Sequence, residues 1–147
     1  MSMTESPAGD RLELLAKVLL PVANEEDALL TAKALEPYEP GGVIALHVVE
    51  KGEGVPDKTP VIASEELAEK AYAAVRSVFP DAEDHTMYRR NVVDAIFKGA
   101  EEVGASAIAF RTRGGNRLIQ FLSGDRSLRL VTNADRPVIA LPVRSEK

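Results

Sequence analysis

The chain has 147 residues, 45% of them hydrophobic and 28% charged, which predicts one globular domain (residues 10–147) after a flexible tail (residues 1–9). Its net charge of −5 argues against nucleic-acid binding, and no apolar run approaches the roughly 18 residues of a membrane span, so we expect neither partner. Because there is no cysteine, disulfides, thiolate metal sites and cysteine nucleophiles are excluded, and we expect a cytoplasmic protein.

The first half of the chain predicts two buried strands and the helix between them. Residues 17–22 and residues 43–49 are short apolar runs without helical spacing, which is typical of strands buried on both faces. Asn24 is predicted to cap a helix that runs to about Leu35. Three acidic residues occupy the first turn, where the helix dipole favours negative charge, and we expect them to be solvated: Glu25, Glu26 and Asp27.

The second half continues the alternation of helices and strands. Ser64 is predicted to cap a helix that ends before Pro80, and Gly104 is predicted to end another in a left-handed conformation. Residues 85–88 form a polar strand candidate that suits a sheet edge better than its centre. The remaining predicted elements are a helix over 92–103, a strand over 106–110, a helix over 126–131 and a strand over 137–142.

This alternation predicts an α/β fold, a doubly wound parallel sheet of five strands with helices on both faces. Ligands in such sheets bind at the carboxyl ends of the strands, where the winding direction reverses. If the first and fourth strands are neighbours there, residues 21–25 and residues 111–116 line one crevice.

A glycine loop follows the predicted fourth strand. Gly114 and Gly115 lie after it, and Gly124 precedes a helix, an order that aims backbone N–H groups and a helix N-terminus at one spot, as in phosphate sites. Paired glycines also mark plain turns, so the loop alone leaves both interpretations open. Positive charge is concentrated in the part of the chain that contains this loop. Residues 111–147 hold eight Lys/Arg against three Asp/Glu, a net of +5, whereas residues 1–110 hold ten against twenty, a net of −10.

No residue or motif in the sequence indicates catalysis. His47 lies in an apolar strand and is expected to be a core histidine with satisfied hydrogen bonds, and His85 is expected to be an exposed strand residue. Two histidines without metal-ligand spacing argue against zinc, and no serine lies in a Gly-x-Ser-x-Gly elbow. We therefore expect no enzyme, no metal and no catalytic residue.

Four segments, in this order and spacing, together resemble the universal stress protein family. They are Lys17-Val-Leu-Leu-Pro-Val-Ala-Asn, Gly42-Val-Ile-Ala-Leu-His-Val-Val, Asp94-Ala-Ile-Phe-Lys-Gly-Ala, and Arg111-Thr-Arg-Gly with Asp135-Arg-Pro-Val-Ile-Ala-Leu-Pro. The resemblance covers about residues 16–143. It implies a five-stranded, doubly wound domain that dimerises, is cytoplasmic and serves the stress response.

The resemblance also implies where ATP would bind. Members that bind ATP carry Gly-x-x-Gly, nine residues, then Gly-Ser or Gly-Thr, with an aspartate after the first strand. Gly114 and Gly124 match with nine residues between them, but three positions depart from the pattern. Arg111 replaces the first glycine, Asp125 replaces the hydroxyl residue, and Ala23 replaces the aspartate.

These departures predict weak or absent ATP binding. Arg111 fills space that a glycine leaves for a ligand, and Asp125 puts a negative charge where phosphate oxygens would lie. Like charges about 4 Å apart cost on the order of 4 kcal/mol at an effective dielectric near 20, roughly a thousandfold in affinity. We predict that Arg111 and Asp125 pair with each other across the crevice, because they are opposite in charge and replace the two ends of one phosphate site.

Two function classes follow from the sequence. The favoured one is a regulatory or protein-interaction domain without a cofactor, with an unidentified protein partner. The alternative is an adenine-nucleotide-binding stress regulator that uses the loop of Gly114, Gly115 and Gly124. In either case we expect a homodimer through the C-terminal strand, Pro137 to Val143, whose two faces are both apolar; the other possibility for this edge is that residues 10–16 fold back and cover it.

Overall fold

The computed structural model describes residues 13–50, 59–89, 91–111 and 124–142. Its strands are β2 (Val18–Pro21), β3 (Val43–Glu50), β4 (Glu83–Arg89), β5 (Ala107–Arg111) and β6 (Val138–Leu141). Its helices are α1 (Glu25–Leu35), α2 (Thr59–Val78), α3 (Val92–Val103) and α4 (Gly124–Thr132), with a short 3₁₀ helix, η2 (Glu36–Tyr38), after α1.

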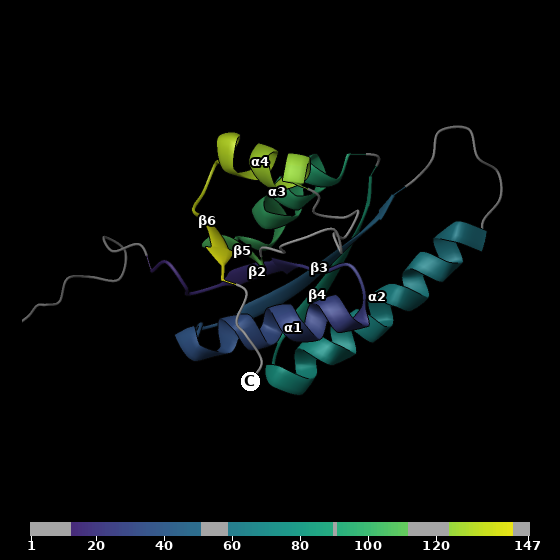
Figure 1. Cartoon of the computed structure of the whole chain (residues 1–147), viewed down its shortest axis with the longest axis horizontal. Helices are drawn as coiled ribbons and strands as arrows, with labels where there is room; N and C mark the ends of the chain where they lie inside the picture. The colour runs from purple at the N-terminus through teal and green to yellow at the C-terminus, as the bar shows by residue number, and fades with distance from the viewer. Residues whose placement is uncertain (1–12, 51–58, 90, 112–123, 143–147) are drawn as a thin grey trace, which may run out of the picture.

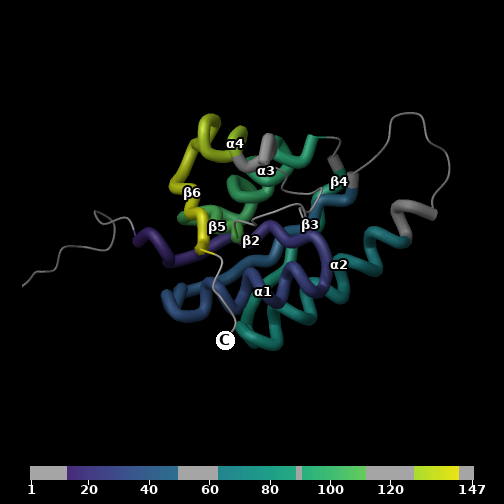
Figure 2. The backbone as a smooth tube through the Cα atoms, in the orientation of Figure 1, coloured from purple at the N-terminus to yellow at the C-terminus, as the bar shows by residue number. Residues whose placement is uncertain are grey.

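The five strands form one parallel sheet in the order β4-β3-β2-β5-β6. From β2 the chain winds outward through β3 to β4, and it then returns to the other side of β2 to add β5 and β6; Figure 2 shows β6 and β4 at opposite sides of the molecule. The predicted doubly wound sheet is confirmed. The condition on which the predicted crevice depends is also met, because the first and fourth strands, β2 and β5, are neighbours. The polar strand candidate lies at an edge, as expected.

Helices cover both faces of the sheet. Figure 1 shows α1 and α2 on one face and α3 and α4 on the other. Alternate strand residues point to opposite faces, so Leu19 and Ile108 pack in the cluster that contains α3, whereas Leu20 and Ala109 pack in the cluster that contains α1 and α2. Burial of both faces explains why the central strands are continuous apolar runs.

The helix boundaries confirm two predicted caps and correct one. Asn24 caps α1 by accepting a hydrogen bond from the Asp27 backbone N–H at 2.8 Å. Gly104 ends α3 in the left-handed region, with φ 69°. The prediction that Ser64 caps α2 is wrong, because α2 begins at Thr59, with Pro60 in the first turn, where a missing N–H costs nothing.

The residues before β2 lie at the amino-terminal edge of the sheet. The Leu15 carbonyl accepts a hydrogen bond from the Gly41 N–H at 2.7 Å, and the Leu14 carbonyl accepts one from the Ser106 hydroxyl at 2.8 Å. Gly41 has no room for a side chain here, because a Cβ would lie 2.9 Å from the Ala16 carbonyl oxygen. Residues 13–16 are therefore anchored next to the starts of β3 and β5, and residues 10–12 of the segment that could cover β6 lie outside the described residues.

Candidate functional site

The winding of the sheet reverses between β2 and β5. β2 ends at Pro21 and leads into α1, and β5 ends at Arg111. We call the carboxyl ends of these two strands, together with the first turn of α1, the switch point, because it is where doubly wound sheets place their ligands.

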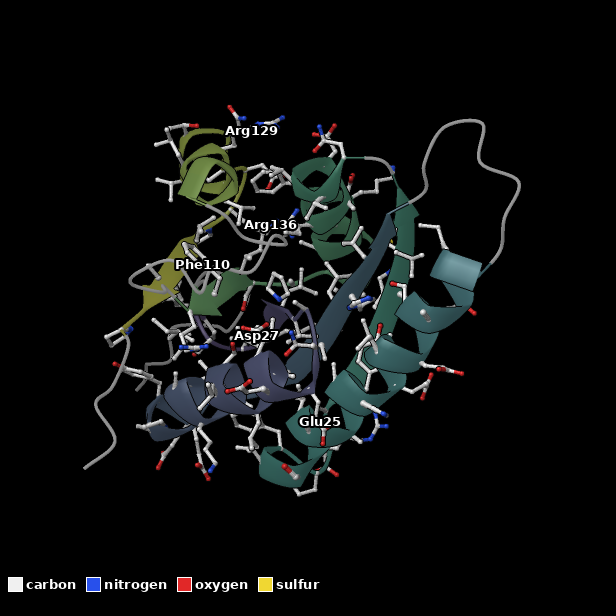
Figure 3. The ribbon with its side chains drawn as sticks, turned by 45° about the vertical axis from the view of Figure 1, so that its right-hand side comes forward. Glu25, Asp27, Phe110, Arg129 and Arg136 are labelled. Atoms are coloured by element: carbon white, nitrogen blue, oxygen red, sulfur yellow. The ribbon has the colours of Figure 1, made fainter. Side chains whose placement is uncertain are left out.

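Asp27 turns its carboxylate back toward the switch point. It is the third residue of α1, and its Oδ2 accepts a hydrogen bond from the Ala23 N–H at 2.9 Å. With the hydrogen bond from the Asp27 N–H to Asn24, this forms a reciprocal arrangement that resembles a capping box shifted by one residue. Figure 3 shows Asp27 on the side of α1 that faces the sheet.

Burial of Asp27 corrects one sequence expectation. The first-turn acidic cluster was expected to be solvated, and Glu25 and Glu26 are indeed exposed, but Asp27 is only 5% exposed. The physical reason is the bond to Ala23, which draws this side chain inward. The pattern Asn24-x-x-Asp27 is the signal that sequence reasoning missed, since a cap residue followed three positions later by an acid is typical of reciprocal capping.

Arg111 meets Asp27 across the switch point. Its Nη2 lies 3.8 Å from Asp27 Oδ1, and the two side chains are 10% and 6% exposed. The hydroxyl of Thr31, one turn further along α1, donates to the same carboxylate oxygen at 3.5 Å. Two opposite charges withdrawn from water attract each other far more strongly than a surface pair.

The other predicted site residues are placed in part. Ala23 is half-buried, next to the carboxylate that accepts from its N–H. Gly124 begins α4, whereas Gly114 and Gly115 lie outside the described residues. The side chain of Asp125 also lies outside them, so its pairing with Arg111 stays a prediction, and the partner that the structure gives Arg111 is Asp27.

His47 lies beneath α2 as a core histidine with satisfied hydrogen bonds, as the sequence predicts. Its Nδ1 donates to the Val22 carbonyl at 3.1 Å, and its Nε2 therefore accepts from the Ser64 hydroxyl, also at 3.1 Å. Burial lowers the pKa of His47 below its usual range, and the bond to Val22 opposes this effect. His85, which was expected to be an exposed strand residue, lies in β4 but is half-buried, and its Nε2 lies 2.9 Å from Glu102 Oε1.

Two hollows lie away from the switch point. One, of about 360 Å³, is at the amino-terminal edge of the sheet and includes Lys17, Gly41 and Asp81 in its lining. The other, of about 320 Å³, lies between α2 and β4 and includes Glu65, Glu69 and Tyr88. Among the described residues no group of three or more His, Asp or Glu side chains is arranged to hold a metal ion, and no described helix is long and apolar enough to cross a bilayer.

Comparison with solved structures shows the same fold. The universal stress protein from Archaeoglobus fulgidus matches with a TM-score of 0.63 and 23% identity over 85% of this chain and 92% of that chain. The universal stress protein from Archaeoglobus fulgidus in complex with dAMP matches with a TM-score of 0.64 and 22% identity over 88% and 99%. The hypothetical protein PH0823 matches with a TM-score of 0.66 and 28% identity over 90% and 99%.

Comparison at the level of sequence gives two results. No curated protein matches this chain. The model of the Universal stress protein family matches residues 15–142, which include every described helix and strand. The chain therefore belongs to the universal stress protein family.

Proposed function

We propose that this protein is a regulatory or interaction domain of the cytoplasmic stress response that binds ATP weakly or not at all and catalyses no reaction. The observation that supports the proposal is the buried Arg111 side chain at the switch point, next to Asp27. A nucleotide would have to displace this side chain and separate the ion pair before it could use the space.

Two further features support weak binding. Ala23 offers no side-chain acceptor for a sugar hydroxyl or an adenine amine, so a nucleoside loses a polar contact there. Its backbone N–H is already bonded to Asp27, at 2.9 Å. In this proposal the protein acts through its surface on a partner protein, not through a bound cofactor.

Calorimetry tests the proposal directly. Titration of the unaltered protein with ATP and magnesium is expected to show no binding tighter than about 1 mM, equivalent to roughly −4 kcal/mol. Native mass spectrometry of freshly purified protein is expected to show no bound nucleotide. Micromolar affinity, or copurified nucleotide, would overturn the proposal.

Rebuilding the family's motif supplies the matching gain of function. The triple substitution Ala23→Asp, Arg111→Gly and Asp125→Ser is expected to strengthen ATP binding, because it restores an acceptor for the nucleoside and removes the negative charge at position 125, where phosphate oxygens would lie. The same titration measures it. An unchanged affinity in a folded triple variant would show that other residues prevent binding.

The alternative function is that of an adenine-nucleotide-binding stress regulator. It is supported by the structure of the Archaeoglobus fulgidus protein in complex with dAMP, which shares this fold. It is also supported by Gly124, which begins α4 at the position where the family's motif has its last glycine. The same calorimetric titration separates the two functions.

A further inference from the structure

The family's ATP motif does not include position 27, yet Asp27 is the residue that Arg111 faces. We propose that Asp27 determines the ligand specificity of the switch point: its carboxylate acts as an internal anion for Arg111 and thereby excludes ligands that carry phosphate. This inference deepens the proposed function and rests on it. It assigns the exclusion to a charge on α1, in addition to the altered glycine loop.

The Asp27 carboxylate is held in place by its own helix. Oδ2 is fixed by the Ala23 N–H at 2.9 Å, and Oδ1 lies 3.5 Å from the Thr31 hydroxyl oxygen. A carboxylate with two such anchors and 6% side-chain exposure keeps its position. It therefore presents a fixed negative charge to whatever enters the switch point.

Arg111 would be an anion site if Asp27 were uncharged. It lies at the carboxyl end of β5, close to the N-terminus of α1, where the helix dipole also favours an anion. A guanidinium in such a place binds phosphate oxygens through paired donors. When Asp27 is charged, its carboxylate neutralises the positive charge of Arg111 and repels a second anion. A phosphate therefore gains little attraction at this position.

Exclusion of phosphate by the charge of Asp27 and exclusion by the volume of the Arg111 side chain predict opposite results when these two residues are substituted. If the Asp27 charge excludes phosphate, Asp27→Asn should create an anion site, because asparagine retains an acceptor for the Ala23 N–H while Arg111 keeps its charge. Arg111→Ala should not create one, because the Asp27 carboxylate would remain. If the volume of the Arg111 side chain were what excludes phosphate, Arg111→Ala would be the variant that gains affinity.

The experiment measures the thermal midpoint and the calorimetric affinity of the full chain with pyrophosphate, AMP and adenosine. Asp27→Asn is expected to bind pyrophosphate and AMP at least tenfold more tightly than the unaltered protein, and these two ligands should raise its midpoint. Adenosine, which carries no phosphate, should give no gain. Glu26→Gln is the matched control, because it removes the same charge from an exposed position of the same helix turn.

The double variant Asp27→Asn, Arg111→Met is expected to lose the gain, which places the anion on Arg111. A folded Asp27→Asn that gains nothing, or an equal gain in Glu26→Gln, would overturn the inference while leaving the proposed function intact. A gain in Arg111→Ala equal to that in Asp27→Asn would assign specificity to volume. Micromolar binding of AMP by the unaltered protein would instead refute the proposed function itself.

Removal of one partner from a buried ion pair destabilises a protein, so a second variant is needed in case Asp27→Asn alone does not fold. Asp27→Asn combined with Arg111→Lys covers that case, because a flexible lysine carries its charge into water more easily than arginine does. This variant is expected to show the same gain for pyrophosphate over Arg111→Lys alone. Equal affinities in the two would contradict the role of Asp27.

Discussion

At the scale of single residues, the buried hydroxyl of Tyr72 is held by two hydrogen-bond partners. The Tyr72 hydroxyl donates to the His85 carbonyl at 2.8 Å and accepts from the Thr86 hydroxyl at 2.6 Å. Burial raises the pKa of Tyr72 to about 12, against an opposing effect of the bond from Thr86. The hydroxyl therefore stays protonated in the folded protein at pH values where it ionises in the unfolded chain.

Tyr72 should make the protein less stable in alkali. Between about pH 10 and pH 12 the unfolded chain loses the proton and the folded protein keeps it, so the free energy of unfolding falls as pH rises. From about pH 8 to pH 11 we expect a loss of about 1 kcal/mol that Tyr72→Phe does not show, measured by urea unfolding. Tyr38, which is exposed, provides the control: Tyr38→Phe should keep the alkaline loss.

His47 should make the protein less stable in acid, whereas Tyr72 does so in alkali. Because its pKa is lowered by burial, the unfolded chain binds this proton at higher pH than the folded protein does. The contribution of His47 to stability is complete above its unfolded pKa of about 6.5 and is lost as pH falls through its lowered folded pKa. Proton NMR titration of the ring checks this, and a folded-state pKa above about 6.5 would contradict it.

At the scale of elements, the ends of helices follow their sequence signals closely. α3 begins after Asn91, whose side chain accepts from the Asp94 N–H at 3.0 Å, and it ends at Gly104, whose N–H bonds back to the helix. A Cβ at Gly104 would meet no atom within 4 Å, so only the backbone angle favours glycine at this position. Gly99 differs, because its Cβ would lie 3.1 Å from Leu46 Cδ1 in the core.

Gly104→Ala should therefore destabilise the protein by backbone strain alone. The left-handed conformation costs a residue with a Cβ roughly 1 kcal/mol, and we expect that decrease in the free energy of unfolding. Urea unfolding measures it, with Lys98→Ala at an exposed position of the same helix as the control. No decrease would mean that the helix end relaxes into another conformation.

At the scale of the whole molecule, one edge of the sheet is apolar and the other is polar. β6 is the edge strand whose Val138 and Ile139 are half-buried, and two large exposed apolar residues, Leu128 and Val131, lie on neighbouring α4. The opposite edge, β4, carries charged residues such as Glu83 and Asp84, which oppose edge-to-edge pairing. We therefore expect β6 to pair with a second copy of the chain.

Light scattering with size exclusion tests the dimer. The chain has a mass of about 16 kDa, so a dimer gives about 32 kDa. Ile139→Lys should halve the mass, because a two-fold interface loses both copies of a contact at once. Leu141 is unsuitable for this test because it is buried in the core of its own chain. Glu83→Lys at the other edge should leave the mass at about 32 kDa, and a monomeric unaltered protein would contradict the prediction.

The predictability of the site differed from that of the fold. The sequence predicted the strands, two of the helix caps and the doubly wound sheet, because periodicity, capping residues and alternation are local signals. The pairing of β2 with β5 entered only as a condition, which the structure meets. The sequence predicted that Arg111 lies at the switch point, but it proposed Asp125 as the partner by analogy with a ligand's phosphate. Ser64 has the chemistry of a cap and so predicts a start of α2 later than the observed start at Thr59.

The sequence alone determined the alternation of elements and the family, since both are encoded in spacing along the chain. Only the tertiary structure decided that Asp27 is buried and that it meets Arg111, 84 positions later in the chain. The physical reason is that the helix dipole favours an acid in the first turn whether its side chain is exposed or buried, but burial of the charge is costly unless partners compensate it. Whether folding brings a cation within reach decides this, and local sequence carries no information about that distance.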